Sequence, residues 1–384
     1  MLKRSKSKVT LKSAFYRPDW LLIFLVLGLT VFGVIMVGNA SVVEAYRDFG
    51  NKFYYFRLQT FWAILGLSAF FVFSFFDYRR LKKITIPLML FSLFSLIVVL
   101  IPGLGTKVLG ARRWLVLGPL TFQPAELAKL SFILYLATFL SNKNLSPEAT
   151  EPCFSNKRKL WPFLVILGVL LGLIMLEPDL GTAVVLAATS LVVYFVSGAP
   201  LLSLTLVGLT GILAGVGMIL FSPYRRERLS TFLNPTHDPL GASYHIRQIL
   251  LALGSGGLWG LGLGQSRQKY EYLPAVMTDS IFAVIAEELG FIGGAAILLA
   301  FLFIIWRGFK IAQGAPDRFG QLLAVGITAW IGLQALINLA AMVALVPLTG
   351  VPLPFISYGG SSLVVTLAGM GILINISKYR VVKK

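Results

Sequence analysis

One carboxylate, Asp279, stands where acid–base chemistry on a membrane-bound substrate could take place. It lies in the run 272–280, Tyr-Leu-Pro-Ala-Val-Met-Thr-Asp-Ser, which ends a long basic segment and precedes a strongly apolar stretch. Ionisable groups at membrane depth are usually functional, and a carboxylate can act as a general base toward a hydroxyl. The competing interpretation is a helix cap, in which Thr278 or Asp279 accepts backbone N–H groups of the following helix. The residues of this run support both interpretations.

Charged residues elsewhere in the chain could bind an anionic ligand. Glu126 and Lys129 are three residues apart in an apolar run, so they share one face of a helix. They could line a wet groove, or they could neutralise each other as an ion pair. Arg113, which Arg112 and Trp114 flank, could clamp a phosphate or anchor the chain at the lipid headgroups.

Four other segments carry weaker signals. The glycine-rich segment Gly254–Gly264 could form a backbone nest for phosphate, although it lacks the Walker and dinucleotide patterns. Glu287 and Glu288, more than two turns inside an apolar helix, predict a hydrogen-bonding group within a helical bundle, and a proton relay is the alternative. The run 177–179, Glu-Pro-Asp, predicts a tight turn. The run 347–360 contains three prolines, so it must be a loop that is buried against protein or lines a cavity.

The composition is that of a polytopic membrane protein. A hydrophobic content of 57% leaves too little polar surface for a soluble domain of 384 residues. The net charge of +18 lies in clusters between apolar stretches, as in membrane proteins, and does not indicate a nucleic-acid partner. A single cysteine, Cys153, excludes an intramolecular disulfide and a cysteine-based metal cluster. The two histidines, His237 and His245, are too few for a zinc site.

The apolar runs predict an all-α fold with ten transmembrane helices in a single membrane domain, residues 1–384. Each run is near the length that a bilayer requires. The first is interpreted as a retained helix, because no small-residue cleavage site follows it. The predicted spans cover residues 20–40, 58–76, 84–101, 124–141, 161–177, 181–198, 201–221, 280–305, 319–346 and 361–377.

The basic residues predict the orientation of these spans. With the N-terminus inside, 21 of the 34 Lys and Arg residues fall in inner segments and 13 on the outer side, Lys129 included. The termini, 1–19 and 378–384, are then cytoplasmic, and the long loop 222–279 between the seventh and eighth helices is extracytoplasmic. Within this loop, Tyr244–Leu253 predicts a short interfacial or re-entrant helix. The large outer share of cations indicates a use for positive charge on that face.

Four sequence blocks, spread from the third span to the last, occur together in this chain. They are Gly110-Ala-Arg-Arg-Trp-Leu with Phe122–Leu130, Glu177–Thr182, the glycine-rich run from Ala252 through to Glu288-Leu-Gly290, and Leu353–Ser362. Together they resemble the SEDS family (shape, elongation, division and sporulation), which includes FtsW and RodA. The resemblance implies a peptidoglycan glycosyltransferase that polymerises lipid II on the outer face of the bacterial cytoplasmic membrane. The run 268–274 favours the division-type FtsW branch.

The resemblance also implies roles for individual residues. Asp279 matches the family's essential aspartate, which would deprotonate the acceptor sugar hydroxyl that displaces undecaprenyl pyrophosphate, with inversion. Glu126 and Lys129 match a groove-lining pair, and Arg113 matches a functionally important arginine. With Lys269 of the outer loop, these three are the expected substrate-binding residues. A divalent cation, Mg²⁺ or Mn²⁺, could assist the leaving group, and its ligands are unknown.

The resemblance implies as partners lipid II, the nascent glycan strand, membrane lipids and a class B penicillin-binding protein. The last would dock on the final spans and on the loop 222–279. Two residues depart from the family pattern: Met277 stands where many members have histidine, and Glu177 replaces the usual glutamine. A lipid II flippase is the main alternative, and a scaffold for other wall enzymes is a third. A flippase needs a site open to both sides, whereas a polymerase needs only the outer one.

Overall fold

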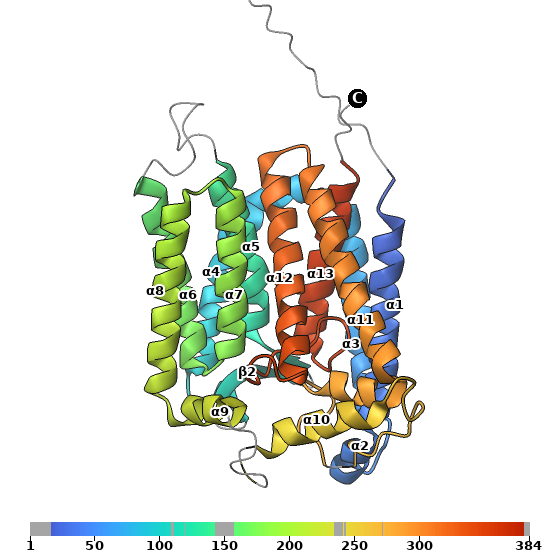
Figure 1. Ribbon diagram of the computed structural model, residues 1–384. Helices are drawn as coiled ribbons and strands as arrows, with labels where there is room; N and C mark the ends of the chain where they lie inside the picture. Colours follow the sequence, from blue (N-terminus) through green and yellow to red (C-terminus); the bar gives the residue numbers. More distant parts are fainter. Residues whose placement is uncertain are drawn as a thin grey trace, which may run out of the picture.

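The computed structural model is a bundle of long apolar helices, with short elements gathered at one end (Figure 1). The structure describes residues 17–108, 111–118, 120–142, 157–233, 241, 243–270 and 272–379. Several sequence expectations concern positions outside these described residues, namely most of the N-terminal segment 1–19, most of the tail 378–384, Gly110, Cys153 and His237.

Ten apolar helices run along the bundle in the described part of the chain. They are α1 (Trp20–Ala40), α3 (Tyr54–Phe75), α4 (Leu81–Leu100), α5 (Pro124–Ser141), α6 (Lys157–Leu176), α7 (Leu180–Val196), α8 (Leu201–Leu220), α11 (Ile281–Gln313), α12 (Arg318–Met342) and α13 (Gly360–Ser377). Eight are long and apolar enough to cross a membrane, and α6 and α7 supply shorter apolar stretches. The prediction of an all-α membrane fold with ten helices is therefore confirmed.

Residues at the helix starts explain several of the boundaries. Pro124 opens α5, where its missing N–H leaves no hydrogen bond unmade. Asp179 is the N-cap of α7, and its side chain accepts a hydrogen bond from the Thr182 N–H (3.0 Å). Asp317 caps α12 in the same way through the Gly320 N–H (2.8 Å). These caps satisfy backbone donors that the first helical turn cannot pair.

The centre of the bundle is formed by α12 and α13, which are buried along most of their length. Helix α13 packs mainly on α3, and α12 packs on α11, α5 and α7. A Cβ atom at Gly371 of α13 would lie 2.4 Å from the Phe70 carbonyl oxygen of α3, so only glycine permits this close approach. At the edge of the bundle, the stretch Leu201–Met218 of α8 is exposed or half-buried throughout, as expected for a lipid-facing helix (Figure 1).

The shorter elements lie together at the lower end of Figure 1. They are α2 (Val42–Phe49), the strands β1 (Gly105–Val108), β2 (Ala111–Leu117) and β3 (Leu120–Phe122), and the helices α9 (Pro223–Leu233) and α10 (Tyr244–Gly256). The strands form one antiparallel sheet in the order β1-β2-β3. Helix α10 confirms the short helix predicted from residue 244. The sheet, α2 and α9 have no counterpart among the sequence predictions.

The glycine-rich segment after α10 packs against a break in α11. Gly290 interrupts α11 with φ 67°, a conformation that favours glycine. Backbone hydrogen bonds join the two segments, from the Leu261 N–H to the Glu287 carbonyl (3.0 Å) and from the Phe291 N–H to the Gly257 carbonyl (2.8 Å). These glycine-segment groups therefore serve packing inside the fold rather than a phosphate nest.

Candidate active site

Asp279 lies half-buried at the mouth of α11. The N-cap of this helix is Ser280, not Thr278 or Asp279, so the predicted cap interpretation is wrong in that respect. The Asp279 carboxylate instead accepts a hydrogen bond from the Thr278 hydroxyl (3.1 Å). A carboxylate that is not used as the cap of the following helix is available for another role.

The backbone at Asp279 is held by Asn338 of α12. The Asn338 side-chain amide donates one hydrogen bond to the Asp279 carbonyl (2.9 Å) and one to the Val351 carbonyl (2.8 Å). Asn338 itself is buried in the centre of the bundle. A single rigid side chain therefore joins the mouth of α11 to the proline-rich segment 347–359, which the sequence predicts to be a loop against protein.

Two further hydrogen bonds fix the residues on either side of Asp279. The Tyr358 N–H, from the segment 347–359, donates to the Met277 carbonyl (2.8 Å). His245 of α10 shares a hydrogen bond between its Nε2 atom and the Ser280 hydroxyl (2.7 Å). Contacts from α10, from α12 and from the segment before α13 thus orient residues 277–280, which is the preorganisation that a catalytic group needs.

His245 is also an electrostatic neighbour of Asp279. Burial lowers the pKa of the His245 imidazole; the Asp279 carboxylate opposes this shift and the Arg228 guanidinium adds to it. The imidazole is therefore neutral at neutral pH. Sequence reasoning considered His245 only as a zinc ligand, and the signal that identifies it here is its hydrogen bond across 35 residues to Ser280.

Two adjoining cavities lie beside this segment. The first, of about 210 Å³, is lined by His245, Arg228 and other side chains of α9 and α10. The second, of about 220 Å³, is lined by Arg113, Arg225 and Arg228 together with the segment 347–350. We call the second the arginine cavity. Arg228 and Leu348 line both cavities, so the cavities adjoin, and His245 of the first cavity contacts Ser280, next to Asp279.

Arg113, on strand β2, has a structural role as well as its place in the arginine cavity. Its Nε–H donates to the Glu177 carbonyl (2.9 Å), and its guanidinium also hydrogen-bonds to the Pro178 carbonyl. The small sheet therefore carries Arg113 to the turn between α6 and α7. Part of the guanidinium is used by this turn, while the side chain still lines the cavity.

Glu177, in the same turn, is fully buried. Neither of its carboxyl oxygens has a hydrogen-bond partner among the described residues. Burial and the nearby Asp179 carboxylate raise the pKa of Glu177 to about 9, against the opposing effect of Arg113. Glu177 is therefore protonated at neutral pH, and its neutral carboxyl resembles the glutamine that the family pattern has at this position.

The Glu177→Gln variant is expected to lose less of its free energy of unfolding than the wild type when the pH is raised from 5 to 9. The folded protein holds the Glu177 proton more tightly than the unfolded chain does, so the free energy of unfolding falls between pH 4.5 and about 9. At pH 7 this effect is on the order of 3 kcal/mol. Melting temperatures of both proteins at pH 5, 7 and 9 measure it. Parallel pH profiles for the wild type and the variant would show that Glu177 is ionised in the folded protein.

Glu126 and Lys129 form an ion pair inside the bundle. The Lys129 Nζ atom lies 2.9 Å from Glu126 Oε1 and 2.8 Å from Gln334 Oε1, and it lies over the Trp330 ring at 5.4 Å. Lys129 is only 1% exposed. The pair therefore joins α5 to α12, and neither residue lines either of the two cavities. The sequence allowed either a wet groove lined by Glu126 and Lys129 or an ion pair between them, and the structure contains the ion pair.

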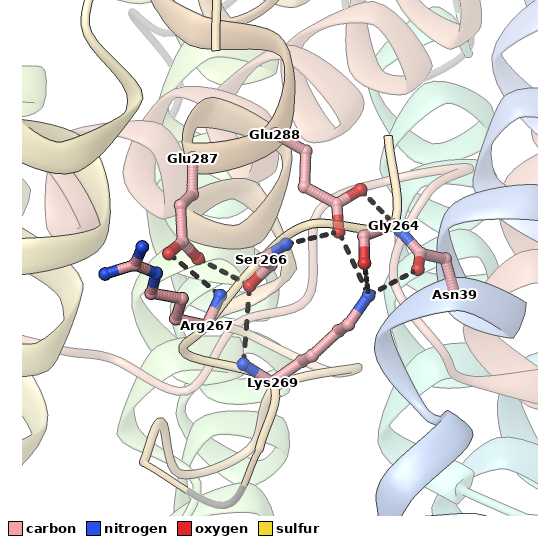
Figure 2. A network of polar contacts seen from close by, with 7 residues as sticks. All are labelled: Asn39, Gly264, Ser266, Arg267, Lys269, Glu287 and Glu288. Atoms are coloured by element: carbon pink, nitrogen blue, oxygen red, sulfur yellow. Dashed lines mark hydrogen bonds and ion pairs between the residues drawn. The ribbon is translucent and has the colours of Figure 1, made fainter. Parts of the chain in front are cut away.

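Lys269 is likewise engaged in an internal network (Figure 2). Its ammonium contacts the Asn39 Oδ1 atom of α1 (3.0 Å) and the Glu288 Oε1 atom of α11 (3.4 Å). Glu287, the residue before Glu288 in α11, accepts a hydrogen bond from the Arg267 backbone N–H (3.1 Å). Lys269 is 6% exposed, so this network joins the segment before α11 to α1 and α11.

The residues in the described part of the chain do not form a metal-binding cluster. No group of three or more His, Cys, Asp or Glu side chains converges there.

The fold and the site define a polytopic membrane protein with a preorganised carboxylate beside an arginine-lined cavity at one end of its helices. The chain belongs to the FtsW/RodA/SpoVE family, whose model, described as a cell cycle protein, matches residues 19–381. The predicted membership of the SEDS family is confirmed.

Relatives of known name cover almost the whole chain. "Stage V sporulation protein E" of Bacillus subtilis (strain 168) is 44% identical over 362 residues, covering 94% of this chain and 97% of that protein. "Probable peptidoglycan glycosyltransferase FtsW" of Trichlorobacter lovleyi is 39% identical over 359 residues, covering 94% and 93%. Both the sporulation and the division branches of the family are therefore similar to this chain.

Two solved structures have the same fold. One, described as "Structural coordination of polymerization and crosslinking by a peptidoglycan synthase complex", has a TM-score of 0.75 and 33% identity, covering 94% of this chain and 97% of that one. The crystal structure of the rod shape determining protein RodA from Thermus thermophilus has a TM-score of 0.68 and 32% identity, covering 96% and 99%.

Proposed function

We propose that this protein polymerises lipid II into glycan strands at the outer membrane face, with Asp279 as the general base. The observation that carries the proposal is Asp279 itself, oriented on both sides by hydrogen bonds from separate elements and adjoining an arginine-lined region. Relatives named peptidoglycan glycosyltransferases support the reaction class. Lipid II turnover by the purified protein tests it.

The chemistry is a single displacement. Asp279 accepts the proton of the acceptor sugar hydroxyl while that oxygen forms a bond to the anomeric carbon of the donor. The bond from that carbon to the undecaprenyl pyrophosphate oxygen breaks, and the leaving group takes the electron pair. An α-linked donor thus gives a β-linked product, so one base suffices.

The leaving pyrophosphate is assigned to the arginine cavity. Arg113, Arg225 and Arg228 line it, and guanidinium groups suit phosphate oxygens because they donate parallel hydrogen bonds. Contact of Lys129 or Lys269 with the pyrophosphate would require their internal ion pairs to open. Their substrate-binding role, and that of Glu126, stays a prediction, as does a requirement for Mg²⁺ or Mn²⁺.

Arg113→Ala is expected to lower lipid II turnover by about tenfold or more, because one charge-assisted contact to the leaving group is lost. Arg225→Ala should act in the same direction without disturbing the turn that Arg113 holds. Arg226→Ala is the matched control, since Arg226 is exposed and does not line the arginine cavity. If lipid II turnover is the same in all three folded variants, Arg113 does not bind the leaving group and its role is purely structural.

We further propose that the termini are cytoplasmic and that the end of the bundle with α2, α9 and α10 faces outward, following the basic-residue bias. In a Cys153→Ser background, Ser230→Cys and Tyr270→Cys should react with a membrane-impermeant thiol reagent on intact cells. Lys83→Cys should react only after permeabilisation. If Lys83→Cys alone is labelled in intact cells, the proposed orientation is wrong and Asp279 lies on the inner face.

The proposed protein partner is a class B penicillin-binding protein. The structural relative described as a peptidoglycan synthase complex supports this partner. The expected docking surface consists of the final spans and the loop 222–279. Such an assembly would couple strand synthesis to crosslinking at one location.

A further inference from the structure

A chain of aromatic rings leads to Tyr358, whose backbone N–H contacts the segment that carries Asp279. Phe49 of α2 stacks on Tyr54 of α3 with ring centroids 3.8 Å apart. Tyr55 contacts both rings edge-on, at 5.8 Å and 5.3 Å. Tyr55 then contacts Tyr358 at 5.2 Å. We call these four residues the aromatic ladder.

The aromatic ladder connects the protein surface to the active-site segment. Its outer members are exposed, Phe49 by 49% and Tyr54 by 38%, whereas Tyr55 and Tyr358 are half-buried. The Tyr358 N–H donates to the Met277 carbonyl (2.8 Å), two residues before Asp279. The ladder therefore ends at one side of the segment 277–280, and His245 with the arginine-lined cavities joins that segment at Ser280.

The two approaches to Asp279 differ in chemistry. The arginine cavity presents the guanidinium groups of Arg113, Arg225 and Arg228, which suit a pyrophosphate. The ladder presents ring faces and tyrosine hydroxyls, and on its outer helix α2 the Asp48 carboxylate is neutralised by an ion pair with Arg47 (2.7 Å). Aromatic faces pack on the C–H faces of pyranose rings, and the hydroxyls can hydrogen-bond to sugar oxygens. These groups suit an uncharged sugar chain rather than an anion.

We propose that the aromatic ladder binds the sugar rings of the glycan strand next to Asp279. The inference rests on the proposed function, because it assigns the strand to one side of the base and the lipid pyrophosphate to the other. Interfacial anchoring in lipid headgroups is the competing role for exposed aromatic residues. Anchoring does not require mutually contacting rings that lead inward to an active-site segment.

The test measures sugar binding without turnover. The probe is a lipid-free, β-linked N-acetylhexosamine hexasaccharide, titrated against the full-length protein in nanodiscs. Phe49→Ala combined with Tyr54→Ala should weaken its affinity by about tenfold, since two stacking faces are lost. Phe49→Tyr combined with Tyr54→Phe keeps both rings and should bind within about twofold of wild type. Phe221→Ala, at the outer end of α8 and 91% exposed, is the control for a lost interfacial ring.

The outcomes separate this inference from the proposed function. Weakened hexasaccharide binding in the alanine double variant alone supports the ladder, even if the protein never polymerises lipid II. If the alanine double variant polymerises lipid II with unchanged sugar affinity and unchanged product length, the ladder does not bind the glycan strand. The proposed function is unaffected by that result. A lower yield of nanodisc-embedded protein, with unchanged sugar affinity of the fraction that inserts, assigns the rings to membrane anchoring and also overturns the ladder.

Discussion

The Asp279→Asn protein is expected to fold, to bind lipid II and to form essentially no polymer. Asparagine keeps the size of the side chain but cannot accept the proton of the attacking hydroxyl. Loss of a general base lowers rates by about 100- to 10,000-fold. The backbone contacts of Asn338 to the carbonyl of this residue do not depend on its side chain, so the segment should keep its position.

Binding and turnover are measured separately on this variant, by lipid II titration and by gel analysis of glycan products. Asp48→Asn, on α2, controls for the loss of one negative charge, since the exposed Asp48 carboxylate forms an ion pair with the exposed Arg47. Since Ser280 occupies the N-cap of α11, a loss of folded protein is not expected. Near-wild-type polymer yield from Asp279→Asn would rule out the catalytic assignment.

Lys129→Ala is expected to lower the free energy of unfolding by about 3–5 kcal/mol, because it leaves Glu126 as an uncompensated charge in the bundle. It also removes the contacts with Gln334 and Trp330. Glu126→Gln combined with Lys129→Met should regain most of that stability, since neither side chain is then charged. Thermal unfolding of the purified single and double variants measures both effects.

The double variant also tests whether the pair contacts substrate. A folded double variant with wild-type turnover fits a structural ion pair between α5 and α12. A folded double variant that has lost turnover would assign the pair to substrate binding, as the family resemblance implies. If Lys129→Ala is as stable as wild type, the buried pair of this structure is not maintained in solution.

The membrane helices were predictable because a bilayer demands long apolar runs whatever their neighbours are. The predicted span 20–40 coincides with α1, and 124–141 coincides with α5. The sheet β1-β2-β3 escaped prediction, because its short strands carry charged and apolar residues without a helix-length pattern. Helix α2, only eight residues long, is likewise too short for a periodic signal.

At the site, sequence reasoning found the reactive residue types but not their partners. Asp279 and Arg113 stand out by type and position, whereas Asn338 acts on Asp279 across 59 residues of chain. Lys269 looks like an outer-face cation in the sequence, yet tertiary contacts with Asn39, 230 residues away, enclose it. Only the fold distinguishes a cation that faces a ligand from one that neutralises a buried carboxylate.

The most direct test of the proposed function is incubation of the purified wild-type protein with lipid II and no other enzyme. We predict glycan strands that are sensitive to a muramidase, formed together with undecaprenyl pyrophosphate. A flippase or a scaffold would leave lipid II intact in this assay, since neither forms a glycosidic bond. Folded, lipid II-binding wild-type protein that yields no polymer, with or without Mg²⁺ or Mn²⁺, would contradict the assignment of Asp279 as the base of a glycosyltransferase.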